Sequence, residues 1–294
     1  MTIWLRLDET RLPPAALDAL TTGNSVPLFL GPCLDSGPVE ALPVSLPSDR
    51  GPENAAAGEA IALTTQTAAN HLIGHSRAMQ LLRRRIEHLA ARPTNLLIIG
   101  DRGVGKGLVA EAFHEHAHNG AAPFIPFPCS SWTESSLRRA LGEVTKAGRR
   151  ATLFLDEVSD LPLAGQTQLL AWVREGPFAQ AGGRLRLVAS TAVDLILRLV
   201  QRRFHSELYD ALVGSILRVP PLRERLEDLP GLAAHFITRF GARHGNFLRG
   251  ISQPALEQLR RRRWPGNVRE LEVALERAVA CAPGPMLLSR DLAL

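Results

Sequence analysis

A glycine-rich segment, about a third of the way along the sequence, has the residue types and spacing that phosphate binding requires. Apolar residues 96–99 precede three closely spaced glycines, and Lys106 follows the last of them. Glycine permits backbone torsions and close approach that side chains would block, so successive N–H groups and a helix N-terminus can surround phosphate oxygens. Lys106 would reach the outer phosphates as a compact charge. We therefore expect a nucleotide-binding loop of Gly100, Asp101, Arg102, Gly103, Val104, Gly105, Lys106 and Gly107.

One residue of this loop departs from the general pattern. Gly107 replaces the Ser or Thr that usually helps such a loop to hold magnesium. The alternative interpretation is a glycine turn with a structural role alone. The apolar run before the loop and the helix start after it favour the phosphate loop.

Two adjacent carboxylates, Asp156 and Glu157, follow the apolar run 153–155. As neighbours at the end of a strand, they are expected to point to opposite sides. Asp156 can hold Mg²⁺, directly or through water, and Glu157 can polarise an attacking water, the division of roles that phosphoryl transfer requires. Alone, such a pair more often marks a turn, but its position after a phosphate loop favours the catalytic interpretation.

The composition is that of a soluble globular protein with a substantial core. The chain has 294 residues, 45% of them hydrophobic, and a formal net charge of +5. Neither a signal-like start nor about eighteen consecutive apolar residues occur, which argues against export and membrane insertion. Cys33, Cys129 and Cys281 are expected to be small buried side chains, reduced in a cytoplasmic protein. The arginine clusters 83–85 and 260–263 are expected to be solvated helix faces rather than phosphate-binding patches.

The pattern along the chain divides it into four segments. Residues 1–31 hold too little apolar surface for an independent core, and residues 32–70, rich in small residues and proline, are expected to form a flexible linker. Residues 71–222 alternate apolar runs with amphipathic stretches, which predicts a parallel sheet covered by helices, with strands at 96–99, 124–127, 153–155, 187–189 and 216–219. Residues 223–294 show helical periodicity instead, which predicts a separate helical subdomain with helices at 229–240, 253–262 and 268–280.

Four stretches together carry a resemblance to a known family. They are His71-Leu72-Ile73-Gly74, residues 152–158, Pro220-Pro221-Leu222-Arg223-Glu224-Arg225, and Trp264-Pro265-Gly266-Asn267-Val268-Arg269-Glu270-Leu271-Glu272. In this order they resemble the central domain of bacterial enhancer-binding proteins, the sigma-54-dependent transcription activators, over residues 71–294. The resemblance implies an AAA+ P-loop NTPase of α/β class, in which a parallel sheet flanked by helices is followed by a small helical lid subdomain.

The same resemblance implies ATP or ADP with Mg²⁺ as ligands, and assembly into a ring. It locates Ile73 near the adenine, makes Arg269 the sensor arginine of the lid, and makes Thr191 part of the first sensor. Glutamate often stands in the family at the position of Gly107, so the missing Ser or Thr weighs less against the loop.

The sequence also departs from that family. Active members carry a long loop with the sequence GAFTGA that touches the sigma factor, and residues 131–150 leave no room for it. His205 and Ala211 stand where two arginine fingers would reach the neighbouring subunit's ATP, and losing such a finger can slow hydrolysis by about 10³–10⁵. Arg202 and Arg203 lie close by, but two or three positions along a helix point elsewhere. Ala192, next to Thr191, occupies a position that is usually polar.

Two further features bear on function. His114-Glu115-His116-Ala117-His118 satisfies the HExxH pattern of zinc proteases, but it follows the phosphate loop directly and no third ligand is evident, so we expect a solvated helix end. The family usually continues into a helix-turn-helix domain after the lid, whereas the sequence stops at Leu294. We therefore expect no sequence-specific DNA reading from this chain.

These observations predict an ATP-binding transcriptional regulator that resembles sigma-54-dependent activators, with weak or no ATPase activity. It is expected to act through protein partners, by self-association or in a mixed ring with an intact AAA+ paralogue, and to affect the transcription machinery indirectly, away from membranes. Two alternatives stay open. They are an active ATPase with displaced arginine fingers, and a structural AAA+ module that needs no nucleotide.

Overall fold

The computed structural model describes residues 72–118, 122–146, 150–175, 185–246 and 248–292. The predicted amino-terminal segment, residues 1–31, and the predicted linker, residues 32–70, lie outside these ranges, as does Cys33.

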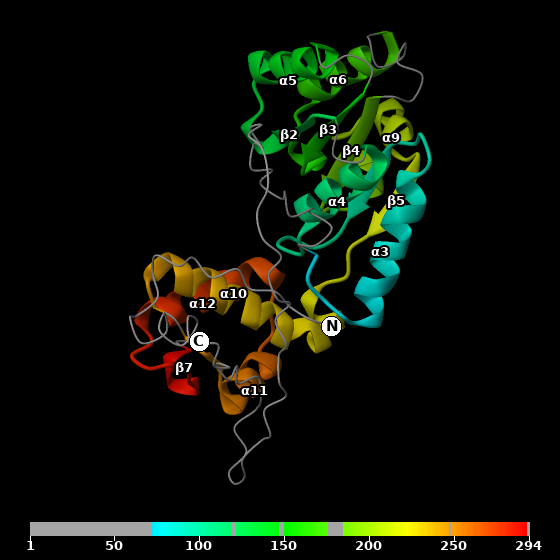
Figure 1. Cartoon of the computed structure of the whole chain (residues 1–294). Helices are drawn as coiled ribbons and strands as arrows, with labels where there is room; N and C mark the ends of the chain where they lie inside the picture. The colour runs from blue at the N-terminus through cyan, green and yellow to red at the C-terminus, as the bar shows by residue number, and fades with distance from the viewer. Residues whose placement is uncertain (1–71, 119–121, 147–149, 176–184, 247, 293–294) are drawn as a thin grey trace, which may run out of the picture. The chain divides into compact units, whose positions relative to one another are not determined.

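Five parallel strands form the sheet at the centre of the first part of the described chain (Figure 1). Each strand pairs in parallel with its neighbours in the order β2-β3-β4-β1-β5. The parallel sheet predicted from the sequence is thereby confirmed, with strand ends that differ slightly. The strands are β1 (Leu96–Ile99), β2 (Phe124–Pro128), β3 (Ala151–Asp156), β4 (Leu185–Thr191) and β5 (Ser215–Arg218).

Residues of β1 show how the sheet divides the core into two layers. Leu96 and Ile98 pack in a cluster with Phe113, whereas Leu97 packs in another cluster with Leu137. Each of these side chains is at most 1% exposed. A strand that is covered on both faces needs apolar side chains at every position, which is why the apolar runs are continuous rather than alternating.

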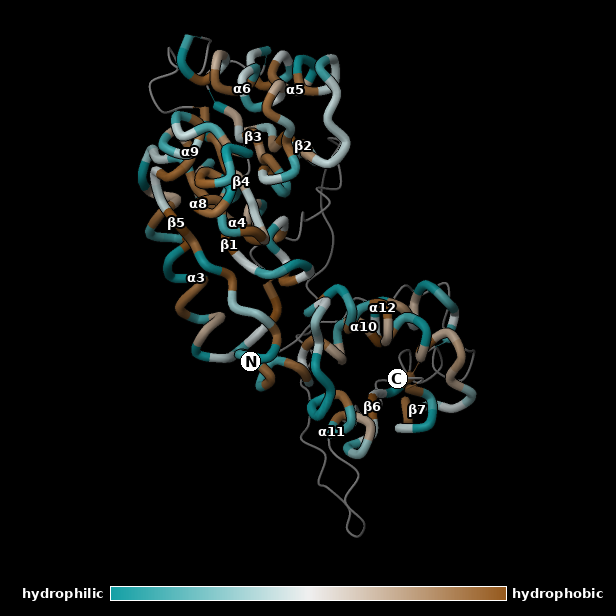
Figure 2. The backbone as a smooth tube through the Cα atoms, turned by 180° about the vertical axis from the view of Figure 1, so that it is seen from behind, coloured by the Kyte–Doolittle hydropathy of each residue, from teal (hydrophilic) through white to brown (hydrophobic). Residues whose placement is uncertain are grey.

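Helices cover both faces of this sheet (Figures 1 and 2). On one face lie α3 (Arg77–Ala90) and α4 (Lys106–His118). On the other lie α5 (Glu134–Lys146), α6 (Leu163–Glu175), α8 (Leu195–Val200) and α9 (Ser206–Leu212). Helix α3 begins where the side chain of Ser76 accepts a hydrogen bond from the N–H of Met79, as is typical of a helix N-cap.

The second part of the described chain is helical, as predicted. It contains α10 (Leu229–His244), α11 (Gln253–Arg261) and α12 (Asn267–Cys281), which share a core that includes Phe240, Leu259 and Leu275. Two short parallel strands were not expected from the sequence, β6 (Gly250–Ile251) and β7 (Met286–Leu287). Short 3₁₀ helices complete the described chain: η2 (Cys129–Ser131), η3 (Val158–Asp160), η4 (Leu222–Glu224), η5 (Leu226–Asp228) and η6 (Ser289–Asp291).

Asp228 joins the start of the described chain to the start of α10. Its carboxylate accepts hydrogen bonds from the backbone N–H groups of His75 and Ser76 and from the hydroxyl of Ser76. Gly74 makes this approach possible, because a Cβ atom there would lie 2.6 Å from Asp228 Oδ2. Asp228 is 1% exposed, so this junction is buried.

The surface expectations hold in part. Arg84, Arg85, Arg260, Arg261 and Arg263 are exposed, as predicted for solvated helix faces. Arg83 is different, because its guanidinium donates to the backbone carbonyl groups of residues 72 and 74. Arg262 also differs, because it is half-buried, follows α11 and pairs with Glu270.

The expectation for the cysteines is confirmed for Cys129, which is buried, and wrong for Cys281, which is exposed. Every helix in the described part of the chain is too short or too polar to cross a membrane.

Candidate nucleotide-binding site

A cavity of about 820 Å³ lies at the carboxyl ends of β1 and β3 and extends to α10 and α12. Ligands of parallel α/β sheets characteristically bind at this edge. The lining residues come from the predicted phosphate loop, the ends of β2 and β3, and the two lid helices. They are Ile73, Arg102, Gly103, Gly105, Lys106, Gly107, Leu108, Ser130, Asp156, Glu157, Asp160, Leu232, His235, Phe236, Arg239, Val268, Arg269 and Glu272.

Lys106 is the first residue of α4, and its side chain is 5% exposed. Its ammonium group lies 2.7 Å from Glu157 Oε1. It also donates hydrogen bonds to the carbonyl oxygens of Gly100, at 2.9 Å, and Asp101, at 3.1 Å. The glycine-rich turn therefore wraps around this cation, and the carboxylate at the end of β3 offsets its charge.

Asp156 and Glu157 both line the cavity, so the prediction that they point to opposite sides is wrong. Glu157 has left the strand and adopts the left-handed conformation, with φ of 52°. This turn redirects its side chain, and its Oε2 accepts a hydrogen bond from the N–H of Ala192 at 2.8 Å. The alternation of side chains applies to extended backbone, and Glu157 is no longer extended.

Ser190, near the end of β4, connects the two carboxylate residues. Its hydroxyl donates to Asp156 Oδ1 at 2.7 Å and accepts from the N–H of Glu157 at 2.9 Å. Strand β4 lies between β3 and β1 in the sheet, so Ser190 is well placed to fix this corner. It is fully buried, and the sequence analysis missed it.

The pKa of the Cys129 thiol reflects the negative charge of the carboxylates near the end of β3. Burial raises its pKa well above the usual range, and the nearby carboxylates of Asp156, Asp160 and Glu157 raise it further. Three carboxylates near the end of β3 favour a cation over an anion at this end of the cavity.

Two glycines of the loop have backbone torsions that side chains rarely adopt. Gly103 has φ of +76° and Gly105 has φ of +99°. Gly103 also touches the lid, since a Cβ atom there would lie 2.2 Å from the carbonyl oxygen of Gly266. Both positions favour glycine because of these backbone torsions. Gly103 also needs it because of its close approach to Gly266, which the sequence did not reveal.

The loop is tied to the start of α12 by hydrogen bonds. The N–H of Arg269 donates to the carbonyl of Gly103 at 3.2 Å, and the amide of Asn267 donates to the carbonyl of Arg102 at 2.9 Å. Asn267 also accepts from the N–H of Leu222 at 2.8 Å. The side chain of Arg269 is 75% exposed and pairs with Glu272 at 3.0 Å. The lid therefore contacts the loop through the backbone of Arg269 and the side-chain amide of Asn267, while the Arg269 guanidinium stays at the rim.

Comparison with protein families identifies this arrangement. The family model of the sigma-54 interaction domain matches residues 73–222, and that of the AAA+ ATPase lid domain matches residues 223–294. This chain belongs to the sigma-54 interaction domain family. Its fold is the AAA+ fold, with a parallel sheet flanked by helices and a helical lid.

Sequence relatives include the DNA-binding transcriptional regulator NtrC of Azospirillum brasilense, 38% identical over 71% of this chain and 48% of that protein. The transcriptional regulatory protein ZraR of Escherichia coli is 36% identical over 76% of this chain and 55% of that protein. Among solved structures, NtrX of Brucella abortus in complex with ADP has a TM-score of 0.67 and 28% identity, over 75% of this chain and 55% of that one. The chain spans about half the length of the curated relatives that it matches.

The sigma-54 interaction domain brings together most of the predicted site residues. Ile73, Arg102, Gly103, Gly105, Lys106, Gly107, Asp156, Glu157 and Arg269 line the cavity. Gly100, Asp101 and Val104 belong to the loop but do not line the cavity. Thr191 is fully buried, and its hydroxyl is engaged with the backbone N–H and carbonyl of Val193, so it closes a turn rather than facing the cavity.

Several residues of the lid that line the cavity were missed from the sequence. Leu232 and Phe236 of α10 face the cavity on the side of Ile73, and His235, Arg239 and Glu272 add polar groups from the lid helices. Helical periodicity showed that α10 has a buried face, but which of its residues meet the cavity depends on how the lid packs. The apolar side chains near Ile73 are suited to a planar base.

The predicted finger positions lie around α9. His205 is the residue before this helix, and its backbone N–H donates to the side chain of Gln166 at 2.9 Å. Ala211 lies within α9, and its carbonyl accepts from Asn95. Arg202 and Arg203 are exposed in the turn between α8 and α9, with Arg202 at φ of 54°. The expectation that these two arginines lie on a helix is therefore wrong.

The HExxH segment is a structural part of α4. The ring of His114 contacts Thr152 Oγ1 at 2.8 Å and the carbonyl of Ala122 at 2.9 Å. His114 and His118 are 5% and 9% exposed, so the prediction of a solvated helix end is wrong. Across the described residues, no three His, Cys, Asp or Glu side chains cluster as metal ligands would. Burial lowers the pKa of both rings, that of His118 to about 4, which keeps them neutral at pH 7.

Proposed function

We propose that this chain binds ATP or ADP in the cavity at the ends of β1 and β3, and regulates transcription through protein partners with little hydrolysis of its own. The observation that carries this proposal is the gathering of Lys106, Asp156, Glu157 and the glycine-rich loop in one cavity. Its volume falls within the range of about 300–1,000 Å³ that is common for small-molecule sites.

The residues of the cavity fit the parts of a nucleotide. Gly103, Gly105 and the N-terminus of α4 suit the phosphates, and Ile73, Leu232 and Phe236 suit the base. Lys106 would exchange its contact with Glu157 for the outer phosphates. Asp156 would hold Mg²⁺, whose charge would offset that of the phosphates. That NtrX of Brucella abortus has been solved with both ADP and ATP supports this assignment.

Slow hydrolysis is proposed because the chain retains Glu157 but has His205 and Ala211 at the finger positions. Glu157 is also held by two partners, Lys106 and the N–H of Ala192, and must leave the first to orient a water. A turnover of about one per second is within the usual range for enzymes. The purified protein should therefore hydrolyse ATP far more slowly than that. Turnover near that rate would refute slow hydrolysis while leaving nucleotide binding in place.

Action through partners is proposed because the segment between β2 and β3 is too short to carry the loop with which active family members contact the sigma factor. Helix α5 begins at Glu134 and ends at Lys146, and β3 begins at Ala151, after four intervening residues of the sequence. A long sigma-contacting loop has no place in this segment. The relatives NtrC and ZraR are transcriptional regulators, which supports a role in transcription.

We further propose that the boundary between the two parts lies at residues 222–223, where the two family models meet. The assembly proposed is self-association or a mixed ring with an intact AAA+ paralogue. Such a subunit can keep a usable phosphate loop and still fail to complete its neighbour's site.

Titrating the chain into a purified sigma-54-dependent activator tests the mixed ring. ATP turnover and open-complex formation should fall by more than the mole fraction of this chain. Unchanged activity together with separate elution would reject the mixed ring and leave nucleotide binding untouched.

An active ATPase with displaced fingers is the second candidate, because Arg202 and Arg203 are exposed immediately before α9. Rapid turnover that collapses in Arg202→Ala or Arg203→Ala would establish it. A structural module that needs no nucleotide is the remaining alternative, and it predicts no heat and no thermal shift with ATP or ADP.

A further inference from the structure

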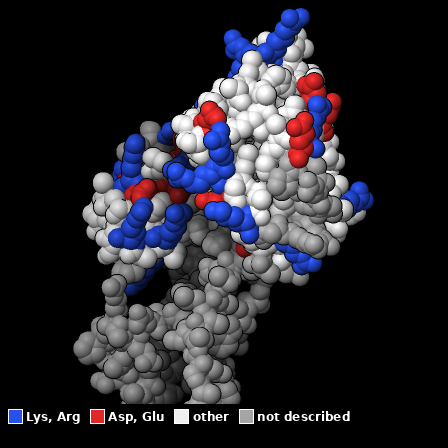
Figure 3. Space-filling view, turned by 90° about the horizontal axis from the view of Figure 1, so that it is seen from above, with Lys and Arg blue, Asp and Glu red and all other residues white. Residues whose placement is uncertain are grey.

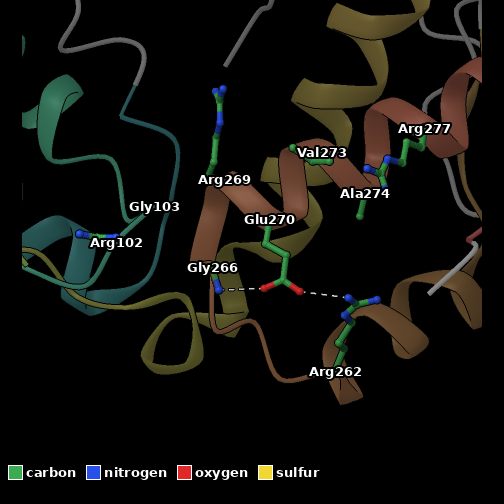
Figure 4. Close-up of a pocket in the computed structure, with 9 residues that line it drawn as sticks. All are labelled: Arg102, Gly103, Arg262, Gly266, Arg269, Glu270, Val273, Ala274 and Arg277. Atoms are coloured by element: carbon green, nitrogen blue, oxygen red, sulfur yellow. Dashed lines mark hydrogen bonds and ion pairs between the residues drawn. The ribbon is translucent and has the colours of Figure 1, made fainter. Parts of the chain in front are cut away.

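A second cavity, of about 450 Å³, lies beside the nucleotide cavity against the first turns of α12. Three separate elements line it. The phosphate loop contributes Arg102 and Gly103, and the residue that follows α11 is Arg262. Helix α12 and its N-cap contribute Gly266, Arg269, Glu270, Val273, Ala274 and Arg277. Figure 4 shows Arg262, Glu270, Ala274 and Arg277 around one end of this space, and Arg102, Gly103 and Arg269 around the other.

The cavity carries an excess of positive charge. Four arginines line it, and one carboxylate, Glu270, lies among them. Glu270 is already engaged, because its Oε1 pairs with Arg262 at 3.0 Å and its Oε2 accepts from the N–H of Gly266 at 2.8 Å. Arg269 pairs with Glu272. Arg102 and Arg277 have no acidic partner within 4.0 Å among the residues of the described ranges.

Positive charge alone would not single out this place. Figure 3 shows basic side chains over several parts of one face, with acidic side chains among them. What distinguishes the cavity is its concave shape together with an apolar floor. Val273, 37% exposed, and Ala274 form this floor.

Guanidinium groups bind phosphate oxygens through paired hydrogen bonds, and Arg is preferred over Lys for this geometry. An apolar floor suits the carbon skeleton of a small ligand, and the volume lies within the range of about 300–1,000 Å³ that such ligands occupy. We propose that this cavity is a second anion site, which binds a small organic phosphate with at least two negative charges. It is separate from the nucleotide site proposed above.

The two cavities share Arg102, Gly103 and Arg269 in their walls. A ligand that draws the Arg269 guanidinium into the second cavity removes it from the rim of the first. Occupancy of one site therefore changes affinity at the other, and by thermodynamic linkage the effect is reciprocal. The second site is in this way a point from which a metabolite can set nucleotide affinity.

Inorganic pyrophosphate is the probe for the test, and titration calorimetry on the whole chain is the measurement. Because pyrophosphate can also enter the phosphate loop, the test is made in Lys106→Ala. Binding should persist in this variant and weaken about tenfold or more when Arg277→Ala is added. Arg277 is exposed, so its replacement should leave the thermal unfolding midpoint nearly unchanged. Val273→Glu, which adds a negative charge to the floor, should weaken binding in the same way.

Arg84→Ala in the same background is the matched control, since Arg84 is an exposed arginine of α3 outside the cavity. An equal loss in this control would show unspecific attraction and overturn the proposal. So would loss of all pyrophosphate binding in Lys106→Ala alone, or unchanged binding in both Arg277→Ala and Val273→Glu. Binding of a hexaglutamate peptide in place of pyrophosphate would overturn it in favour of an acidic protein segment. Failure of the nucleotide proposal has a different signature, which is absence of ATP and ADP binding in the unmodified chain.

Discussion

Lys106, the first residue of α4, and Glu157, the residue after β3, form an ion pair of 2.7 Å in the wall of the cavity. Both side chains are largely buried, at 5% and 20% exposure. The pair joins the residue expected to hold phosphates to the residue expected to orient water.

Lys106→Ala should reduce ATP and ADP affinity by about 100-fold or more, because it removes the only side-chain cation buried in the loop as described. Isothermal titration calorimetry measures this loss. Lys146→Ala is the matched control, since Lys146 is the only other lysine of the chain and is exposed at the end of α5. Equal affinities for the two variants would contradict a phosphate role for Lys106.

Ser190→Ala should weaken binding of the Mg²⁺ nucleotide more than binding of the metal-free nucleotide. The hydroxyl holds Asp156, and without it this carboxylate loses its orientation. The substitution also leaves the N–H of Glu157 without its acceptor, which should cost about 1–3 kcal/mol of unfolding free energy. The affinity ratio with and without EDTA is the readout, and Ser135→Ala, at an exposed serine of α5, is the control. An unchanged ratio would remove Asp156 from the metal site.

Two glycine substitutions should change the unfolding free energy in opposite directions. Gly103→Ala introduces a Cβ atom 2.2 Å from the carbonyl of Gly266, at φ of +76°, and should lower the unfolding free energy by about 1–3 kcal/mol. Gly142→Ala lies in α5 with nothing within 4 Å of the new Cβ, and should raise it by about 0.5–1 kcal/mol. Urea denaturation of both variants measures the difference. A neutral effect at Gly103 would show that the loop and α12 are not in contact in solution.

Acid should destabilise the fold through His118. Burial lowers its pKa to about 4 in the folded state, and the nearby charges of Arg186 and Arg150 act in the same direction. The unfolded chain, with a pKa near 6.5, therefore binds the proton more readily, so stability is complete above pH 6.5 and is lost as the pH falls toward 4. The unfolding free energy should fall by on the order of 1–3 kcal/mol over this pH range.

Denaturation between pH 7 and 4.5 tests the role of His118. The unfolding free energy of His118→Gln should depend less on pH than that of the unmodified chain, while His88→Gln, at an exposed histidine of α3, should match the unmodified chain. His114, whose pKa burial also lowers, should retain part of the dependence. Identical pH profiles for all three proteins would contradict the assignment.

The strands and lid helices could be predicted because their signals are local. A run such as residues 96–99 is apolar at every position, and only a strand covered on both faces, or a buried helix, accounts for it. Strands β6 and β7 could not be predicted, because two residues carry no periodicity. The glycine-rich loop was predictable because its backbone torsions restrict the residue type.

The missed parts of the site depend on contacts between distant segments. Ser190 is a polar residue within an apolar strand, and its partner is known only once β4 is placed beside β3. Glu157 turns into the left-handed region, which nothing in its residue type predicts. Thr191 was assigned by resemblance, and its hydroxyl is engaged with Val193 instead. His114 and His118 were expected in a solvated helix end because no third metal ligand was evident in the sequence, whereas both rings are buried.

The buried carboxylate of Asp228 bears on how this protein can be divided. Its three hydrogen-bond donors belong to His75 and Ser76, near the start of the region that the first family model matches, whereas Asp228 lies in the region of the lid model. The start of the sheet-containing part is therefore completed by a residue of the lid. A fragment that ends at residue 222 would leave these donors without their acceptor. The two parts are thus separable in the family models but interdependent as folding units, and such a fragment should melt at a lower temperature than the same region in the whole chain.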